Sequence, residues 1–174
     1  MMTIRRLGAD RSTFLDRWES HALLRDDAEI GRMEICAPGM HPNAGLVTVQ
    51  DDHYECRIHF TGKRGLTFVP GRWVMYAGET ELHAARHEDA GTYLIDDVPG
   101  SGSLRLRRNG LLRAGFTIDR MPDEKQIGDV RYLRGRIIPR PRAPQYLLEI
   151  QGLPVTLEIF LAWIVVQYGY EAGS

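Results

Sequence analysis

Two histidines four residues apart, His83 and His87, have the spacing in this chain that best fits metal or acid–base chemistry. On a helix they would share one face and could hold a metal ion, with Glu79 or Glu88 nearby. On a strand the same spacing spans about 13 Å, which no single zinc ion bridges. Helix propensity is fair here, but Gly78 and the short strands expected around this segment favour a strand. We therefore expect no metal site and no cofactor.

The other nucleophilic and acid–base candidates are isolated from one another. His53 and His59 lie about 20 Å apart on a straight strand, and Cys56 faces the opposite side of that strand from His53. The chain contains no G-x-S-x-G, P-loop or H-E-x-x-H motif. We predict that the protein is not an enzyme. The alternative is an enzyme or small-ligand carrier with a pocket lined by histidines and by aromatics such as Trp73 and Tyr76.

Arginines form the strongest charge pattern, because segment 104–142 has many more arginines than acids although the whole chain has a net charge of −1. Near neutrality argues against a generic nucleic-acid or anionic-membrane binder, and segment 104–114 has no aromatic side chain on which bases could stack. We expect these arginines to contact an anionic lipid surface or an acidic protein. The candidate contact residues are Arg105, Arg107, Arg108, Arg113, Arg134 and Arg136. The competing interpretation is the solvated face of an alternating strand.

The acidic residues lie at turns and at a helix start, where such residues are common, so no bound ligand is needed to explain their positions. Asp26-Asp27, Asp51-Asp52 and Asp96-Asp97 lie at expected turns, and calcium would need about six to eight oxygens from one organised loop. Glu158 lies in the first turn of an expected helix, where the helix dipole favours a negative charge. A buried Glu158 would need a partner such as an arginine.

Short runs of apolar residues predict a mainly β protein between residues 29 and 151. Residues 53–60 alternate without a fault between apolar and polar side chains, the period of a half-buried strand. Asn109-Gly110 between two such runs is a strong hairpin signal. The many short strands, evenly spaced, predict a single antiparallel barrel or closed sheet.

Helical spacing predicts one surface helix over residues 10–27, capped by Asp10 or Ser12. Its apolar side would carry Phe14, Leu15, Trp18 and Ala22.

A second helix is predicted over residues 153–168, with Pro154 in its first turn. Residues 159–166 are all apolar, so this helix has no solvent face. It is too short to cross a bilayer, which takes about 20 residues. We therefore expect protein to enclose it, and see no transmembrane segment.

Three stretches resemble the tubby C-terminal-like superfamily, which includes tubby, the LURP-one-related proteins and the phospholipid scramblases. Residues 145–152 running into 157–168 are similar to its last strand and central helix, residues 73–86 to a strand–turn–strand unit, and 127–131 to a strand edge. The resemblance implies a closed barrel of about twelve strands threaded by a hydrophobic C-terminal helix. No functional residue carries over, because neither a scramblase calcium segment nor tubby's phosphoinositide-binding cations match particular positions.

Chain length and composition predict one domain over residues 1–174. No apolar run follows the two N-terminal arginines, so no signal peptide is expected. Cys36 and Cys56 lie far apart and form no C-x-x-C pair, as is usual for buried thiols in a cytoplasmic protein.

Overall fold

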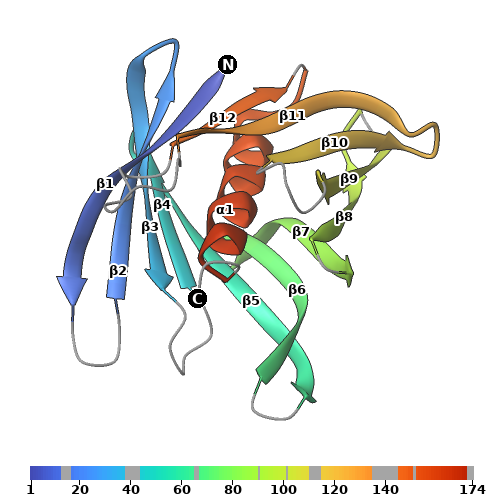
Figure 1. Ribbon diagram of the computed structural model, residues 1–174, viewed down its shortest axis with the longest axis horizontal. Coiled ribbons are helices and arrows are strands. Elements are labelled where there is room, and N and C mark those ends of the chain that lie inside the picture. The colour runs from blue at the N-terminus through green and yellow to red at the C-terminus, as the bar shows by residue number, and fades with distance from the viewer. Residues whose placement is uncertain are drawn as a thin grey trace.

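The computed structural model describes residues 1–12, 17–37, 44–64, 67–89, 91–100, 102–109, 115–134, 145–150 and 152–171. In these residues twelve antiparallel strands form a closed barrel, and one helix, α1 (Val155–Glu171), follows them (Figure 1). The strands are β1 (Met2–Ser12), β2 (Arg17–Arg25), β3 (Ala28–Ala37), β4 (Ala44–Val49), β5 (Asp52–Arg64), β6 (Thr67–Ala77), β7 (Thr80–Asp89), β8 (Thr92–Val98), β9 (Gly102–Arg108), β10 (Gly115–Met121), β11 (Lys125–Arg134) and β12 (Gln145–Ile150). Each strand pairs with its neighbours in sequence, and β1 pairs with β12 to close the barrel.

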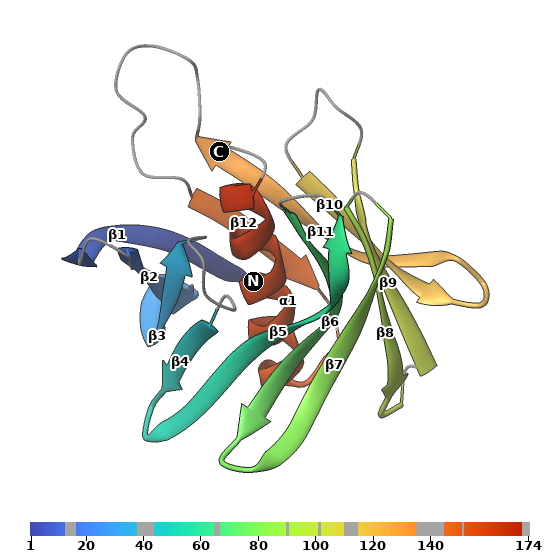
Figure 2. The ribbon, with the colours of Figure 1, turned by 90° about the horizontal axis from the view of Figure 1, so that it is seen from below.

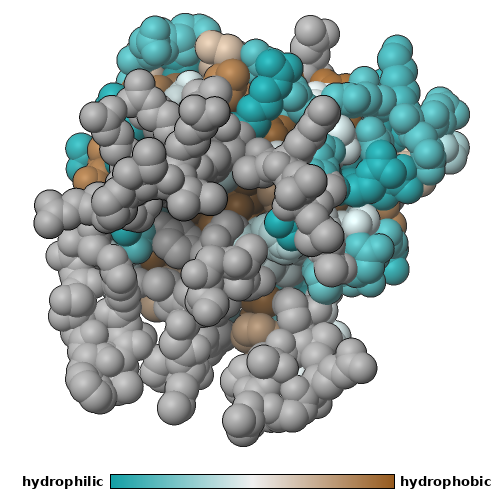
Figure 3. Space-filling view, in the orientation of Figure 1, coloured by the Kyte–Doolittle hydropathy of each residue, from teal (hydrophilic) through white to brown (hydrophobic). Residues whose placement is uncertain are grey.

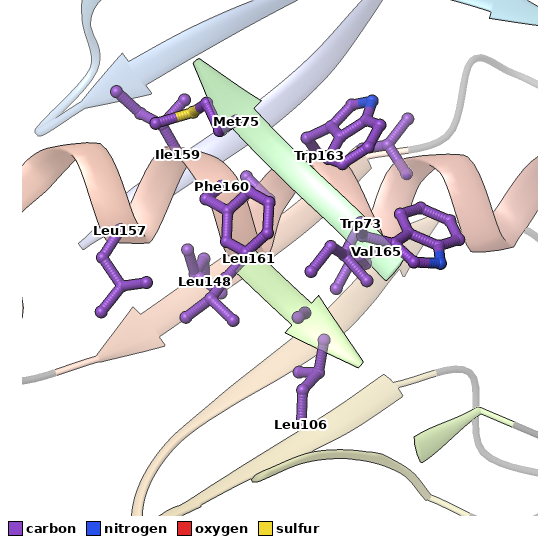
Figure 4. Packing of buried hydrophobic residues seen from close by; sticks show 14 of the residues in the cluster. Trp73, Met75, Leu106, Leu148, Leu157, Ile159, Phe160, Leu161, Trp163 and Val165 are labelled. Carbon is purple, nitrogen blue, oxygen red and sulfur yellow. The ribbon is translucent and has the colours of Figure 1, made fainter. Parts of the chain in front are cut away.

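The barrel encloses α1, which confirms the predicted architecture of a mainly β barrel with a hydrophobic C-terminal helix. Residues 159–167 of α1 are all buried, and their side chains meet inward residues such as Trp73, Met75 and Leu148 (Figure 4). Trp163 lies against Trp73, with ring centroids 5.0 Å apart. Because inward side chains of every strand can contact α1, one helix supplies the core that all twelve strands share.

The predicted N-terminal helix over residues 10–27 is wrong. The described part of that segment belongs to β1, to β2 and to the turn that follows β2, and the two strands pair with each other. The error has a physical reason, because a separation of four residues fits both periods. Trp18 and Ala22 share one face of a strand as well as one face of a helix. The deciding contacts are long-range, such as Leu23 opposite Ile4.

Residues on both sides of Asn109 form strands as predicted, but Asn109-Gly110 is not a two-residue turn. The register places Arg108 opposite Phe116, and the N–H of Asn109 donates to the carbonyl of Gly115 over 2.9 Å. A two-residue turn at this point would instead pair Arg108 with residue 111. Residues 110–114 lie outside the described residues.

The barrel has two distinct ends, because its strands run alternately up and down. The turns after β2, β4, β6, β8 and β10 lie at the end where α1 begins, and Arg25 at the end of β2 contacts Glu158 there. Odd-numbered strands finish at the opposite end (Figure 2). Tyr168, near the end of α1, contacts Arg108 of β9 at that end. Every residue near a strand terminus is therefore assigned to one end or the other.

Candidate functional site

The middle of the predicted arginine surface is neutralised by carboxylates of the same sheet. Arg105 and Arg107 of β9 each place a guanidinium nitrogen 3.5 Å from Asp119 Oδ2 on β10, and Arg105 also lies 3.1 Å from Glu124. The Arg105 side chain is only 17% exposed, whereas that of Arg107 is 54% exposed. Two arginines cover one buried acid, so Arg105 is a structural residue in the described chain.

Arg108 fastens the end of α1 to the barrel wall. Its guanidinium donates to the Tyr168 hydroxyl over 2.9 Å and lies 5.4 Å from the centre of the same ring. The Tyr168 ring also packs edge-on against Phe116 and Tyr93. Arg108 thus combines a hydrogen bond with a cation–π contact, a stabilising pair of contacts independent of any ligand.

The remaining predicted arginines lie nearer the end of the barrel. Arg134 is the last residue of β11. Arg113 and Arg136 are outside the described residues, in the connections that follow β9 and β11. Contact of these arginines with a partner stays a prediction.

Further along the same outer surface, cations and acids again alternate. Arg131 of β11 lies 2.6 Å from Asp129 and 3.1 Å from Glu149 of β12. The exposed side chains of the β10–β11 hairpin form a hydrophilic surface (Figure 3). This strand face is therefore a balanced, solvated one, as in the competing interpretation of the arginine pattern.

Unbalanced charge lies instead at the two ends of the barrel. We define the basic rim as the two terminal residues of every strand at the end where α1 finishes. Within the described chain its charged residues are the cations Arg11, Arg17, Lys63, Arg64, Arg107, Arg108 and Arg134 and the acids Glu88 and Asp89. Cations from five strands thus converge on one end.

The opposite end, where α1 begins, has the reverse sign. We define the acidic rim as the terminal strand residues and the described turns there. Its acids are Asp26, Asp27, Glu29, Asp51, Asp52, Glu79, Glu81, Asp97, Asp123, Glu124 and Glu149, and its cations are Arg25, Arg120 and Lys125. The dipole of α1 complements this arrangement, because its positive N-terminal end lies at the acidic rim.

The acidic pairs predicted to lie at turns do so at two of the three positions. Asp26-Asp27 forms the β2–β3 turn with both φ angles positive, and Asp51 follows Gln50, whose φ is also positive. Asp and Asn tolerate this left-handed conformation better than most residues do. Asp96 and Asp97 lie inside β8 instead. Among the described residues no group of three or more His, Cys, Asp or Glu side chains could hold a metal ion.

His83 and His87 lie on β7, which settles residues 79–88 in favour of a strand over 80–89. His83 Nε2 is 2.9 Å from Thr156 Oγ1 at the start of α1, and its ring lies 5.9 Å from that of Phe160. His87 packs against Tyr93 at 5.3 Å. Burial lowers the pKa of both imidazoles. His83 therefore contacts the helix, whereas His87 contacts the neighbouring strand β8, and the two do not share a partner among the contacts described.

The alternative, a pocket lined by histidines and aromatics, has one partial counterpart among the described residues, a surface pocket of about 670 Å³ whose lining includes His53 and Tyr54 but neither Trp73 nor Tyr76. Trp73 is fully buried between Tyr93 and Trp163. Tyr76 instead faces outward, with its hydroxyl 3.2 Å from His59 Nε2. Core packing and surface contacts account for these aromatics.

Both cysteines are buried free thiols. Burial raises the pKa of Cys56, so its thiol stays protonated at neutral pH.

Buried polar residues on β1 and β2 are a feature that sequence reasoning missed. The Arg6 guanidinium lies 2.6 Å from Glu19, whose side chain is 4% exposed. His21 is fully buried, and burial together with the nearby Arg6 lowers its pKa to about 4. Glu19, His21 and Leu23 share the inward face of β2, which the helical interpretation of residues 10–27 concealed.

Glu158 has the arginine partner that a buried carboxylate requires. It forms an ion pair with Arg25 of β2, and the two side chains are 13% and 33% exposed. Burial raises the pKa of Glu158, and Arg25 opposes this rise. The pair ties the first turn of α1 to the acidic rim.

Comparison with known proteins finds no matching family model, no matching curated protein and no matching solved structure. Within the described part of the chain, no helix has the length and apolar character needed to cross a membrane. What the structure defines is a class of architecture, a closed antiparallel barrel built around its own C-terminal helix.

Proposed function

We propose that the protein is a non-enzymatic binding module whose basic rim contacts an anionic lipid surface or an acidic protein. The observation that carries this proposal is the segregation of charge, with cations of five strands at one end of the barrel and acids at the other. Such a dipolar molecule presents one end to a negative surface and keeps the other end away from it.

The rim supports this function better than the strand face does. Arg105 and Arg131 on the face each have a carboxylate within 3.5 Å, as does Arg107 where the face meets the rim, so a ligand would compete with existing ion pairs at these three positions. At the rim, the segments that follow β9 and β11, residues 109–114 and 135–144, contain no acid and include Arg113 and Arg136. A segment that contains cations and no acids has a net positive charge, which attracts an anionic partner.

The architecture also supports a binding module rather than an enzyme. The interior that would hold a substrate in an open barrel is occupied by α1 and its buried side chains. We further propose membership of the tubby C-terminal-like superfamily, since the barrel and central helix agree with the fold that the sequence resemblance implies. Membership would favour a lipid surface among the anionic partners.

Co-sedimentation with phosphatidylcholine vesicles, with and without a minor fraction of phosphatidylserine, tests the lipid form. We expect binding only to the anionic vesicles, and a steep loss of binding as salt rises through the physiological range. Arg113→Glu and Arg136→Glu should weaken binding severalfold. Lys125→Glu is the matched control, because it makes the same charge change at the acidic rim and should leave binding unchanged.

An immobilised polyglutamate peptide tests the protein form with the same three variants. Equal weakening by Lys125→Glu and by Arg136→Glu would contradict a role for the basic rim. Absence of binding to both the vesicles and the peptide at low salt would contradict the proposed function.

A further inference from the structure

Arg108 at the basic rim differs from other arginines of the described chain in its partner. Where the side-chain contacts of an arginine are described, from Arg6 on β1 to Arg131 on β11, a carboxylate otherwise lies within 3.5 Å. The partly buried guanidinium of Arg108 instead contacts Tyr168, and it has no ion pair with a described acid. Because burial of a charge is costly unless an opposite charge accompanies it, an external anion would complete this position.

The contact between Arg108 and Tyr168 leaves hydrogen-bond donors available. Arg108 Nη1 donates to the Tyr168 hydroxyl over 2.9 Å, so the hydroxyl oxygen is the acceptor and its own proton has no described acceptor. Arg108 Nε and Nη2 have no described hydrogen-bond partner and remain accessible to solvent. A guanidinium and a hydroxyl can therefore donate to the same ligand.

Neighbouring groups hold both donors in place before any ligand binds. The backbone N–H of Arg108 donates to the carbonyl of Gly91 over 2.9 Å. Gly91 has a φ of +92°, and a Cβ atom there would lie 2.8 Å from Arg108 Cβ and 3.4 Å from the Tyr168 hydroxyl oxygen. The Tyr168 ring packs edge-on against Phe116 and Tyr93. Donors that are already ordered cost less entropy to engage.

The surrounding charges favour a ligand group with one negative charge. Arg107, next to Arg108, already has Asp119 within 3.5 Å. Exposed Glu88 and Asp89 end β7 just before Gly91, and they lower the positive potential on this side of the rim. A doubly charged phosphate would need a second cation here. A carboxylate has one charge and two oxygens, which suit a guanidinium and a hydroxyl side by side.

We propose that Arg108 and Tyr168 form an anion subsite that binds a carboxylate of an acidic peptide segment. One carboxylate oxygen accepts from the Tyr168 hydroxyl and the other from the Arg108 guanidinium. The inference rests on the proposed function of the basic rim and names its partner as an acidic protein. Other carboxylates of the same segment reach the remaining cations of the rim.

Binding to an immobilised polyglutamate peptide tests the anion subsite with variants that keep the net charge. Tyr168→Phe retains the ring but removes the hydroxyl donor, so it should bind about tenfold more weakly. Arg108→Lys retains the charge but removes the planar guanidinium, and should bind severalfold more weakly. Thermal unfolding of each variant shows whether the fold is retained.

The same two changes elsewhere on the barrel are the matched controls. Tyr76→Phe removes a hydroxyl that contacts His59 on the outer surface, and Arg131→Lys changes a guanidinium that pairs with Asp129. Both control variants should bind the peptide like the wild type. Equal weakening by a control and by its partner variant would overturn the proposal.

NMR of the full chain gives a direct measure of contact. As polyglutamate is added, the Nε–H signal of Arg108 should shift, whereas that of Arg131 should stay in place. Peptide binding without a shift of the Arg108 signal would place the carboxylates elsewhere on the rim and would overturn the anion subsite.

Vesicles of phosphatidylcholine and phosphatidylglycerol distinguish a protein carboxylate from a lipid phosphodiester. Phosphatidylglycerol has no carboxylate, so Tyr168→Phe should bind these vesicles as the wild type does. A tenfold loss on the vesicles as well would assign the subsite to a lipid phosphodiester and contradict the acidic protein.

The anion subsite and the proposed function can fail separately. If Arg113→Glu weakens peptide binding while Tyr168→Phe and Arg108→Lys bind like the wild type, the basic rim keeps its function and the subsite is wrong. If the wild type binds neither the peptide nor the vesicles at low salt, the proposed function is wrong and the subsite with it.

Discussion

At the scale of single residues, polar groups buried inside the barrel make its folding stability depend on pH. His21 is buried on the inward face of β2, close to Arg6, which forms an ion pair with Glu19. Both the low dielectric and the neighbouring positive charge disfavour an imidazolium at this position. The folded barrel therefore holds His21 neutral.

His21 makes folding stability depend on pH in a defined window. The pKa of His21 is about 4 in the folded protein, against an ordinary value of 6.5 that applies to the unfolded chain. Between these two pH values the unfolded chain therefore binds a proton at His21 that the folded protein does not bind. Stability contributed by the neutral imidazole is thus complete above pH 6.5 and falls as the pH is lowered toward 4, by about 3 kcal/mol in all. Chemical denaturation across this range measures the slope.

His21→Gln should remove most of this slope, whereas His53→Gln, at an exposed position, should retain it. The lowered pKa values of His83 and His87 contribute in the same direction, and the raised pKa of Glu158 acts in the opposite direction. An unchanged slope in His21→Gln would show that His21 can be protonated in the folded barrel.

At the scale of elements, α1 is the core of the barrel rather than an addition to it. Phe160 is fully buried, with its ring 6.0 Å from that of Trp163 and 5.9 Å from that of His83. Each strand alone has only a narrow apolar face, so the strands depend on α1 for burial. Loss of α1 packing should therefore disrupt the whole barrel.

Phe160→Asp should unfold the protein, because the lost ring packing and the burial of an unpaired carboxyl group, even when protonated, together cost about as much as the roughly 5–15 kcal/mol by which domains are stable. Circular dichroism and thermal unfolding measure the result. Val155→Asp is the control on the same helix. Val155 is 38% exposed and begins α1, where a carboxylate is favoured. A folded, soluble Phe160→Asp variant would mean that α1 is not the core.

The contact between β4 and α1 depends on a glycine. A Cβ atom at Gly45 would lie 2.5 Å from Trp163 Nε1, and the tryptophan ring is held by Trp73 and has little room to move. Gly45→Ala should lower the free energy of unfolding by about 1–3 kcal/mol. Gly62→Ala, where a Cβ atom would meet nothing within 4 Å, is the control. Equal thermal stability of the two variants would indicate that the core around Trp163 yields easily.

At the scale of the whole molecule, the up-and-down topology separates charge that the sequence intersperses. Acidic turns and arginine-rich strand ends alternate along the chain, and their sum is close to zero. Because each strand reverses direction, alternate connections lie at the same end of the barrel. The result is a dipolar barrel, with a basic rim for the proposed anionic partner at one end and an acidic rim at the other.

The sequence by itself determined the features that depend on local pattern. The apolar run 159–166 required an enclosed helix, and alternation such as that of residues 53–60 required strands, because burial imposes those periods wherever the partner lies. The arginine excess was also visible, but which arginines have carboxylate partners was not, since Asp119 and Arg105 are far apart in the chain.

Only the tertiary structure decided what depends on strand pairing. It replaced the helix over residues 10–27 with β1 and β2, because a spacing of four fits both periods and the pairing of Leu23 with Ile4 resolved it. It also placed the charge asymmetry at the ends of the barrel rather than on the face of β9, where Asp119 pairs with Arg105 and Arg107. These features arise from residues brought together by barrel closure, which no local pattern specifies.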